Sequence, residues 1–410
     1  MIRTQQSTRL LIYSHDSFGL GHLRRCRTIA HSLVSHRRDL QVLILSGSPI
    51  IGSFDFGARV DFVRIPGVIK LSDGAYTSLN LDIDIEETLA MRSSLIRHTA
   101  EVFNPDFLLV DKEPLGLRGE LKDTLAMLSE RGTPLILGLR DVMDEPEQLA
   151  EEWERKGALA SLDSLYDQIW IYGLPQICDP LAGLPVPASV RRKMLYTGYL
   201  RRSPSTVPDG NVIDPVLGDE PFILVTTGGG GDGAALIDWV LRAYEQDPGI
   251  ASPALLVLGP FMHRNLQSEY KHRASRLPRV HAITFDSQIE TLMQRAAGVV
   301  AMGGYNTFCE ILSFDKRALV VPRRTPRLEQ TIRASRAQGL GLIRMLEDDG
   351  LRDPARMAAA LRELPLQPVP SEIHIAGLLD GLSTINGAID RLLTGRPESA
   401  SRLTVVQQAT

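Results

Sequence analysis

The sequence is organised around short apolar runs that are bounded by turn residues and separated by helical patterns. Runs this apolar are typical of strands covered on both faces, as in parallel sheets. Their alternation with helices therefore predicts an α/β fold. The expected strands of a first set are 10–14, 42–46, 107–111, 135–140 and 169–173. Those of a second set are 222–228, 254–259, 280–285, 298–303 and 318–322.

A stretch rich in proline and aspartate, 201–221, separates the two sets and has no periodicity. At about 100–200 residues per domain, a chain of 410 residues suggests two domains. We predict an N-terminal domain over 1–204, a C-terminal domain over 205–370, and a helix with a loose tail over 371–410. Both domains are expected to be doubly wound parallel sheets that face a central cleft. Ligands of such sheets bind beyond the carboxyl ends of the strands.

Composition narrows the class of protein. The formal net charge is −4, so no global basic field attracts nucleic acid. The three cysteines are far apart and form no metal-binding pair, which is typical of a reducing compartment. No apolar run approaches the roughly 18–20 residues that cross a bilayer. We expect a cytoplasmic protein without a transmembrane segment, and the sequence leaves a peripheral membrane contact open.

The first expected strand leads into a glycine-bearing loop, SHDSFGLGHLRR. Gly19 and Gly21 allow the backbone to approach a ligand closely, and the following helix directs free N–H groups at that ligand. His22 lies at the positive end of this helix, where the neutral imidazole is favoured as a base. We predict an acceptor or phosphate site here, with Arg25 as a contributor.

A second glycine loop, TTGGGGDGA, follows the first strand of the second set. Its position between a strand and a helix indicates an anion-binding turn. The next strand ends without the acidic residue that a dinucleotide fold uses for ribose, and no Gly-Lys-Ser/Thr follows the loop. Phosphate binding by another class of site is therefore expected. The loop residues concerned are Thr227, Gly228, Gly229, Gly230 and Gly231.

The most specific segment is AGVVAMGGYNTFCEILSFDKRALVVPRRTPRLEQTIRA, residues 297–334. A strand ends at a Gly-Gly turn and a helix begins directly after it, which offers N–H groups and a hydroxyl to a phosphate. Glu310 follows one turn later, within reach of a neighbouring ribose diol. Glu329 and Gln330 follow the next strand, and such side chains pair with sugar hydroxyls. The turn consists of Gly303, Gly304, Tyr305, Asn306 and Thr307.

This segment resembles the donor-binding signature of glycosyltransferase family 28, which includes the enzyme that adds N-acetylglucosamine to lipid I. The matching positions are Gly303, Gly304, Thr307, Glu310 and Pro322, followed by EQTIRA. Glu329 replaces a Gln of that family and Arg333 replaces an Asn, so N-acetylglucosamine is not assumed. The stretch GLGHLRRC is also similar to the opening of the UDP-sugar hydrolase of pseudaminic acid synthesis, a relative with the same two-domain fold.

The resemblance implies a GT-B fold whose C-terminal domain binds a nucleotide-sugar donor, with UDP as the leading expectation for the nucleotide. The two glycine turns would hold the diphosphate, Glu310 the ribose, and the Glu–Gln pair of EQTIRA the hexose. The base would contact the backbone around Phe285 and Ile289. The acceptor would lie near His22 in the N-terminal domain.

Charged residues directly after buried strands add candidates on the acceptor side. Asp111 stands in LLVDKEP, and Arg140 and Asp141 stand in LGLRDVM. Residues at such positions face the cleft of a doubly wound domain. Either aspartate is a candidate to orient His22 or to replace it as the base, and His15 is an alternative to His22. The same charges are equally consistent with ion pairs that brace loops.

The sequence contains no metal-ligand cluster, because the acidic stretch LDIDIEE is more simply explained as the lead into a helix. We therefore expect an inverting, metal-independent glycosyltransferase without a cofactor, in which the nucleotide sugar is a substrate. The acceptor hydroxyl belongs to a small molecule, a glycan or a lipid-linked molecule. A nucleotide-sugar hydrolase, an epimerase and a non-catalytic nucleotide-sugar sensor remain open alternatives.

Overall fold

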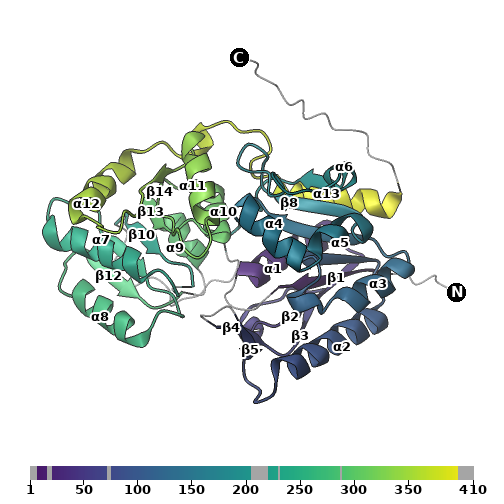
Figure 1. The fold of residues 1–410 in the computed structure, drawn as a ribbon. Coiled ribbons are helices and arrows are strands. Elements are labelled where there is room, and N and C mark those ends of the chain that lie inside the picture. Colours follow the sequence, from purple (N-terminus) through teal and green to yellow (C-terminus); the bar gives the residue numbers. More distant parts are fainter. Residues whose placement is uncertain are drawn as a thin grey trace.

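The computed structural model describes residues 7–15, 21–71, 75–204, 220–229, 231–286 and 289–395. Within them the chain forms two α/β domains side by side (Figure 1). The N-terminal domain is drawn in purple to teal, and most of the C-terminal part is drawn in green. Each domain has a parallel sheet with helices packed against it, which confirms the predicted fold class.

The N-terminal sheet is parallel throughout, in the order β3-β2-β1-β6-β7-β8-β9. The direction of strand succession reverses between β1 and β6, and the crevice beyond their carboxyl ends is the usual ligand position in such a sheet. The strands are β1 (Thr8–Ser14), β2 (Leu40–Ser46), β3 (Val60–Arg64), β6 (Phe107–Asp111), β7 (Leu135–Arg140), β8 (Gln168–Tyr172) and β9 (Met194–Tyr196). The sequence did not predict β3 and β9, because both lie at edges of the sheet and are only partly buried.

The C-terminal sheet is also parallel, in the order β12-β11-β10-β13-β14-β15. Its switch point lies between β10 and β13. The strands are β10 (Ile223–Thr226), β11 (Ala254–Val257), β12 (Val280–Ile283), β13 (Gly298–Ala301), β14 (Ala318–Val320) and β15 (Arg344–Met345). The observed β10 and β13 end two residues before the apolar runs that predicted them, so the last residues of those runs belong to the loops at the switch point.

The helices pack against these sheets, and a small antiparallel hairpin of β4 (Val68–Lys70) and β5 (Tyr76–Ser78) extends from the N-terminal domain. The helices of the N-terminal domain are α1 (Gly21–His36), α2 (Ile85–Phe103), α3 (Lys122–Glu130), α4 (Pro146–Arg155), α5 (Ala158–Ser164) and α6 (Ala188–Arg192). Those that follow are α7 (Ala234–Gln246), α8 (Arg264–Ala274), α9 (Ile289–Arg295), α10 (Tyr305–Ser313), α11 (Glu329–Gly339), α12 (Pro354–Glu363) and α13 (Gly381–Thr394).

The last helix, α13, is yellow in Figure 1; it returns to the N-terminal domain and packs against α1. Its Asp390 pairs with His36 and Arg37 at 2.7 and 3.0 Å. Its first residue, Gly381, has no room for a side chain, since a Cβ would lie 2.7 Å from the carbonyl oxygen of Tyr199. The sequence predicted a helix in this region but not its side of the molecule. The predicted domain limits stay a prediction, and most of the expected linker, 205–219, lies outside the described residues.

A buried ion pair joins the two domains. Arg333 on α11 donates to both carboxylate oxygens of Asp141, which follows β7, at 2.7 and 2.6 Å. The Tyr199 hydroxyl donates to the same carboxylate at 2.7 Å. Arg333 also donates to the carbonyl oxygen of Gly303 at 3.0 Å. Arg333 is therefore paired with a carboxylate of the other domain.

This ion pair carries a stability prediction. The Asp141 and Arg333 residues are 0% and 1% exposed, so Asp141→Ala leaves a buried guanidinium without its counterion. Such a change is expected to lower the free energy of unfolding by about 3–5 kcal/mol. Urea denaturation measures it, and Asp141→Leu with Arg333→Leu should recover most of the loss. The control is Arg37→Ala, whose half-exposed pair with Asp390 contributes about 1 kcal/mol or less. A loss below about 1 kcal/mol for Asp141→Ala would contradict the prediction.

Candidate active site

The cleft between the domains contains a cavity of about 290 Å³, and its walls come from both switch points. Most of the residues predicted from the sequence line it. From the N-terminal domain these are Gly21, His22, Arg25 and Arg140. From the C-terminal domain they are Thr227, Gly228, Gly229, Phe285, Ile289, Gly303, Gly304, Tyr305, Asn306, Thr307, Glu310 and Gln330.

Some predicted residues do not form the wall. Those that lie behind it or away from it are Asp111, Asp141, Gly231 and Glu329. Gly19 and Gly230 fall outside the described residues. Asp141 was predicted as a catalytic candidate, but it is fully buried and its carboxylate is occupied by Arg333 and Tyr199. This saturation favours a bracing role for Asp141, which was the alternative that the sequence left open.

His22 stands in the first turn of α1 and is held by Asp111, the last residue of β6. The His22 Nδ1 lies 2.5 Å from the Asp111 Oδ2. Arg25, one turn further along α1, donates to the two oxygens of Asp111 at 2.8 and 2.7 Å. Donation of the Nδ1–H to Asp111 leaves the lone pair of Nε2 free to accept a proton. His22 lines the cavity, so this lone pair is available to a ligand there.

The electrostatics favour the same protonation state. Burial lowers the pKa of His22, and this outweighs the opposing effect of the Asp111 carboxylate. Burial alone would raise the pKa of Asp111, but Arg25 and His22 outweigh it and hold this pKa well below its ordinary value. At neutral pH the pair is therefore a carboxylate beside a neutral imidazole.

His15, the alternative base, lies behind His22. It is 5% exposed and is absent from the cavity wall. Its ring packs edge-on against that of His22, with centroids 5.7 Å apart. Burial lowers the pKa of His15 well below its ordinary value. The geometry therefore favours His22 as the group that meets a substrate.

The opposite wall is formed by the beginning of α10. Gly303 has a φ of 79°, and a Cβ there would lie 2.7 Å from Val320, so the turn requires glycine. Gly304 precedes the helix and supplies no side-chain cap, which leaves the first N–H groups of α10 available to a ligand. The Asn306 side chain is already engaged, because it donates to Gly21 O at 3.1 Å and accepts from Arg202 at 2.7 Å. A phosphate would therefore meet the backbone at Asn306.

Glu310 lines the cavity from α10 and is 2% exposed. Burial raises the pKa of Glu310. The Arg24 Nη2 pairs with Glu310 and Glu290 at 2.5 and 2.6 Å. Sequence reasoning did not select Arg24 as a site residue. The position of Arg24 beside His22 and Arg25 was a sign that it belongs to the site. Its two glutamate partners could not be inferred, because they are far from it in the sequence.

At the other end, Gln330 lines the cavity and its Oε1 accepts from the backbone N–H of Arg323 at 3.1 Å. Glu329 was predicted to hold the hexose. It is instead buried behind the wall, where it accepts from the Arg323 guanidinium at 2.9 Å. Arg323 and its partner Asp232 do line the cavity, and sequence reasoning did not select either of them.

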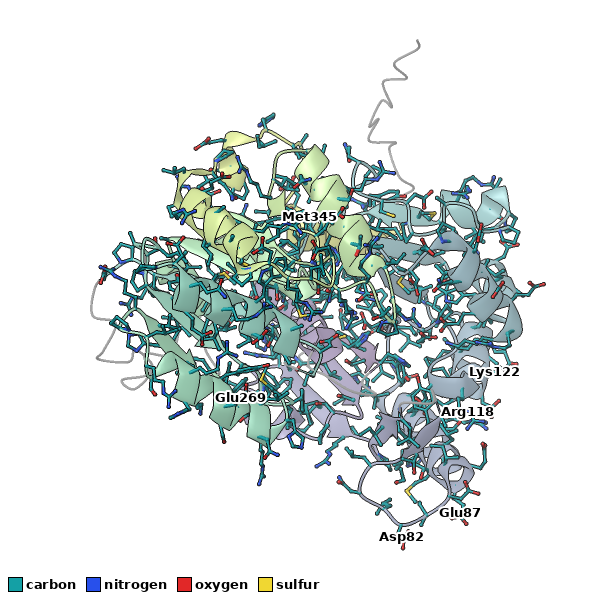
Figure 2. The ribbon with its side chains drawn as sticks, turned by 60° about the vertical axis from the view of Figure 1, so that its left-hand side comes forward. Asp82, Glu87, Arg118, Lys122, Glu269 and Met345 are labelled. Carbon is teal, nitrogen blue, oxygen red and sulfur yellow. The ribbon has the colours of Figure 1, made fainter. Side chains whose placement is uncertain are left out.

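The acidic stretch before α2 has a structural role. Asp84 caps α2 by accepting from the N–H of Glu86 at 3.2 Å. Figure 2 shows Asp82 and Glu87 at the outer tip of the N-terminal domain, away from the C-terminal domain. The part of the chain that the structure describes contains no group of three or more metal-binding side chains. None of its helices is long and apolar enough to span a membrane.

Residues 222–370 match the glycosyltransferase family 28 C-terminal domain. The chain is similar to that family over this stretch. It includes the glycine turn of α10, Glu310 and Gln330, the positions that carried the resemblance in the sequence. None of the curated proteins matches the sequence.

Solved structures show the fold of the whole chain. The glycotransferase of kitacinnamycin has a TM-score of 0.65 at 16% identity, over 94% of this chain and 99% of that one. A UGT transferase from Siraitia grosvenorii gives 0.60 at 13% identity, over 94% and 100%. MurG from Acinetobacter baumannii gives 0.57 at 12% identity, over 95% and 99%. The whole chain therefore has the GT-B fold of these structures, and residues 222–370 match the family 28 C-terminal domain.

The His22–Asp111 pair predicts a pH profile. Burial lowers the pKa of His22 below the ordinary histidine value of 6.5. The imidazole should therefore stay neutral at pH values somewhat below 6.5. Activity should fall only as the pH drops through this lowered pKa, since protonation removes the acceptor lone pair. Measurement of kcat against pH should place the acidic midpoint below 6.5. His22→Gln should remove this limb, and an acidic midpoint above 6.5 would contradict the prediction.

Proposed function

We propose that this protein is an inverting, metal-independent glycosyltransferase that moves a sugar from a nucleoside diphosphate to an acceptor hydroxyl. The observation that carries the proposal is one cavity with a His22–Asp111 pair on one wall and the uncapped start of α10 on the other. A base and a leaving-group site face each other there. UDP is the first expectation for the nucleotide.

In the proposed reaction, His22 Nε2 accepts the proton of the acceptor hydroxyl as its oxygen attacks the anomeric carbon. The bond between that carbon and the diphosphate oxygen breaks, and the electron pair stays on the diphosphate. N–H groups from the start of α10 and from the 227–229 turn would stabilise the developing charge. Asp111 remains ionised and stabilises the imidazolium. Attack from the face opposite the leaving group inverts the anomeric configuration.

The binding roles follow the positions of the side chains. Glu310 would accept hydrogen bonds from the ribose, and Phe285 with Ile289 would border the base. Gln330 would contact the sugar, and Arg140 would face it from the N-terminal domain. Two structures with the same fold support a nucleoside diphosphate as the ligand: the Siraitia transferase is in complex with UDP, and VinC is in complex with dTDP.

A nucleotide-sugar hydrolase is the second candidate, because GLGHLRRC is similar to the opening of such an enzyme. Water would then take the place of the acceptor hydroxyl at His22. Incubation with a UDP-sugar and no acceptor separates the two, since a hydrolase releases stoichiometric UDP rapidly. An epimerase would be distinguished by the stereochemistry of its product. A sensor would bind tightly without turnover.

The first test of this function is ligand binding and turnover together. UDP, dTDP and their sugars should raise the melting temperature, with about 2.7 kcal/mol of added stability at a hundredfold excess over Kd. His22→Ala should lower kcat by about 10²–10⁴-fold and leave the Kd of the nucleotide within about twofold. His98→Ala, an exposed histidine on α2, is the matched control and should retain activity. Full activity of His22→Ala would remove the proposed base.

The second test concerns metal dependence. Backbone N–H groups and the α10 dipole are expected to provide the charge stabilisation that a divalent cation provides elsewhere. Excess EDTA should therefore change kcat and KM by less than about twofold. Loss of activity in EDTA that Mg²⁺ restores would refute the metal-independent mechanism and leave donor binding unaffected.

A further inference from the structure

Two arginines, one from each domain, line the cavity and both lower the pKa of Glu329. Arg140 is the last residue of β7 and Arg323 follows β14, and both line the cavity wall. Gln330, the expected sugar contact, accepts from the backbone of Arg323. The two guanidinium groups therefore belong to the part of the cavity where the transferred sugar is expected.

Arg140 is attracted by Glu329 but is not hydrogen-bonded to it. Its guanidinium makes no hydrogen bond or ion pair with any residue that the structure describes, and its Nε is buried without a partner. Burial lowers the pKa of Arg140 to about 10. The residue is partly exposed, but its Nε is buried, and a buried N–H without an acceptor is costly. An acceptor on a ligand in the cavity would remove that cost.

Arg323 is held in place but is not saturated. Its two Nη atoms pair with Asp232 and Glu329, whereas its Nε is buried without a partner. Glu329 is 4% exposed and stands behind the wall, where it also attracts Arg140. Asp232 is nearly half-exposed and is therefore well solvated. Each domain thus contributes one arginine Nε that is buried without a hydrogen bond, and the Glu329 Oε2 behind the wall and the Tyr305 hydroxyl on it are likewise unpartnered.

We propose that Arg140 and Arg323 bind a carboxylate on the transferred sugar, so that the donor is a nucleotide-linked acidic sugar. A carboxylate only accepts hydrogen bonds, which matches two N–H donors without acceptors of their own. Pairs of guanidinium and carboxylate are among the strongest hydrogen-bonded contacts. The diphosphate would lie on the amide turns, away from this pair. The inference rests on the proposed function, because it assumes that a nucleotide sugar occupies the cavity.

The test compares two donors that differ only at C6 of the sugar. Calorimetry gives the Kd of UDP, UDP-glucose and UDP-glucuronic acid for the intact chain and for Arg140→Met, Arg140→Lys and Arg344→Met. If dTDP binds better than UDP, the dTDP-linked pair is used. The Arg344 side chain is 56% exposed and pairs with Glu363 on the surface, so Arg344→Met is the matched control. Melting temperatures verify that each variant is folded.

The intact chain should bind the glucuronic acid donor about 10- to 100-fold more tightly than the glucose donor. Arg140→Met should abolish this preference and leave the Kd of UDP within about twofold. Arg140→Lys should retain part of the preference, and Arg344→Met all of it. If Arg140→Met does not fold, Arg323→Met is expected to give the same loss.

Equal binding of the two donors by the intact chain would overturn the inference and leave the proposed function standing. A loss of UDP affinity in Arg140→Met equal to that of both sugars would assign Arg140 to the diphosphate, which also overturns it. Failure of every nucleoside diphosphate to bind would refute the proposed function itself.

Discussion

The ion pair between Asp141 and Arg333 is the interaction on which the arrangement of the site depends. It connects the end of β7 to α11 across the domain boundary, with both charges buried. Arg333 extends the connection by donating to Gly303, the residue that turns the chain into α10. The start of α10 is therefore positioned against the N-terminal domain by the same side chain that closes the interface. A buried pair of this kind resists separation because either partner alone would be left uncompensated.

Helix α1 carries the second set of connections. His22 faces the cavity, Arg24 reaches Glu310 and Glu290 in the other domain, and Arg25 holds Asp111. These residues lie within four positions of each other, so one short helical turn serves both the catalytic pair and the interface. Any shift of the domains would change the distance between His22 and the turn of α10. The proposed base and the proposed leaving-group site therefore depend on the same contacts between the domains.

Ion pairing separates two groups of charged residues around the cavity: those already paired with another side chain and those with a donor still unpaired. Asp111 ends β6 and Asp141 follows β7, and each carboxylate is paired with an arginine. Arg24 forms an ion pair with Glu310, the buried carboxylate at the proposed nucleotide end of the cavity. Arg140 differs, because its Nε is buried and makes no hydrogen bond. That contrast is the reason for assigning it a substrate group.

The sequence by itself determined the local features. Strands 107–111 and 135–140 were predicted with their observed limits, because both are buried on each face and read as continuous apolar runs. The turn at 303–307 was predicted because Gly-Gly directly after a strand and before a helix is typical of an anion-binding turn. Only the tertiary structure determined which charged side chains form pairs. Asp111 and Asp141 look alike in sequence, yet one pairs with His22 at a separation of 89 residues and the other with Arg333 at 192. Local patterns record burial and periodicity, whereas such pairings depend on how two separate sheets are placed against each other.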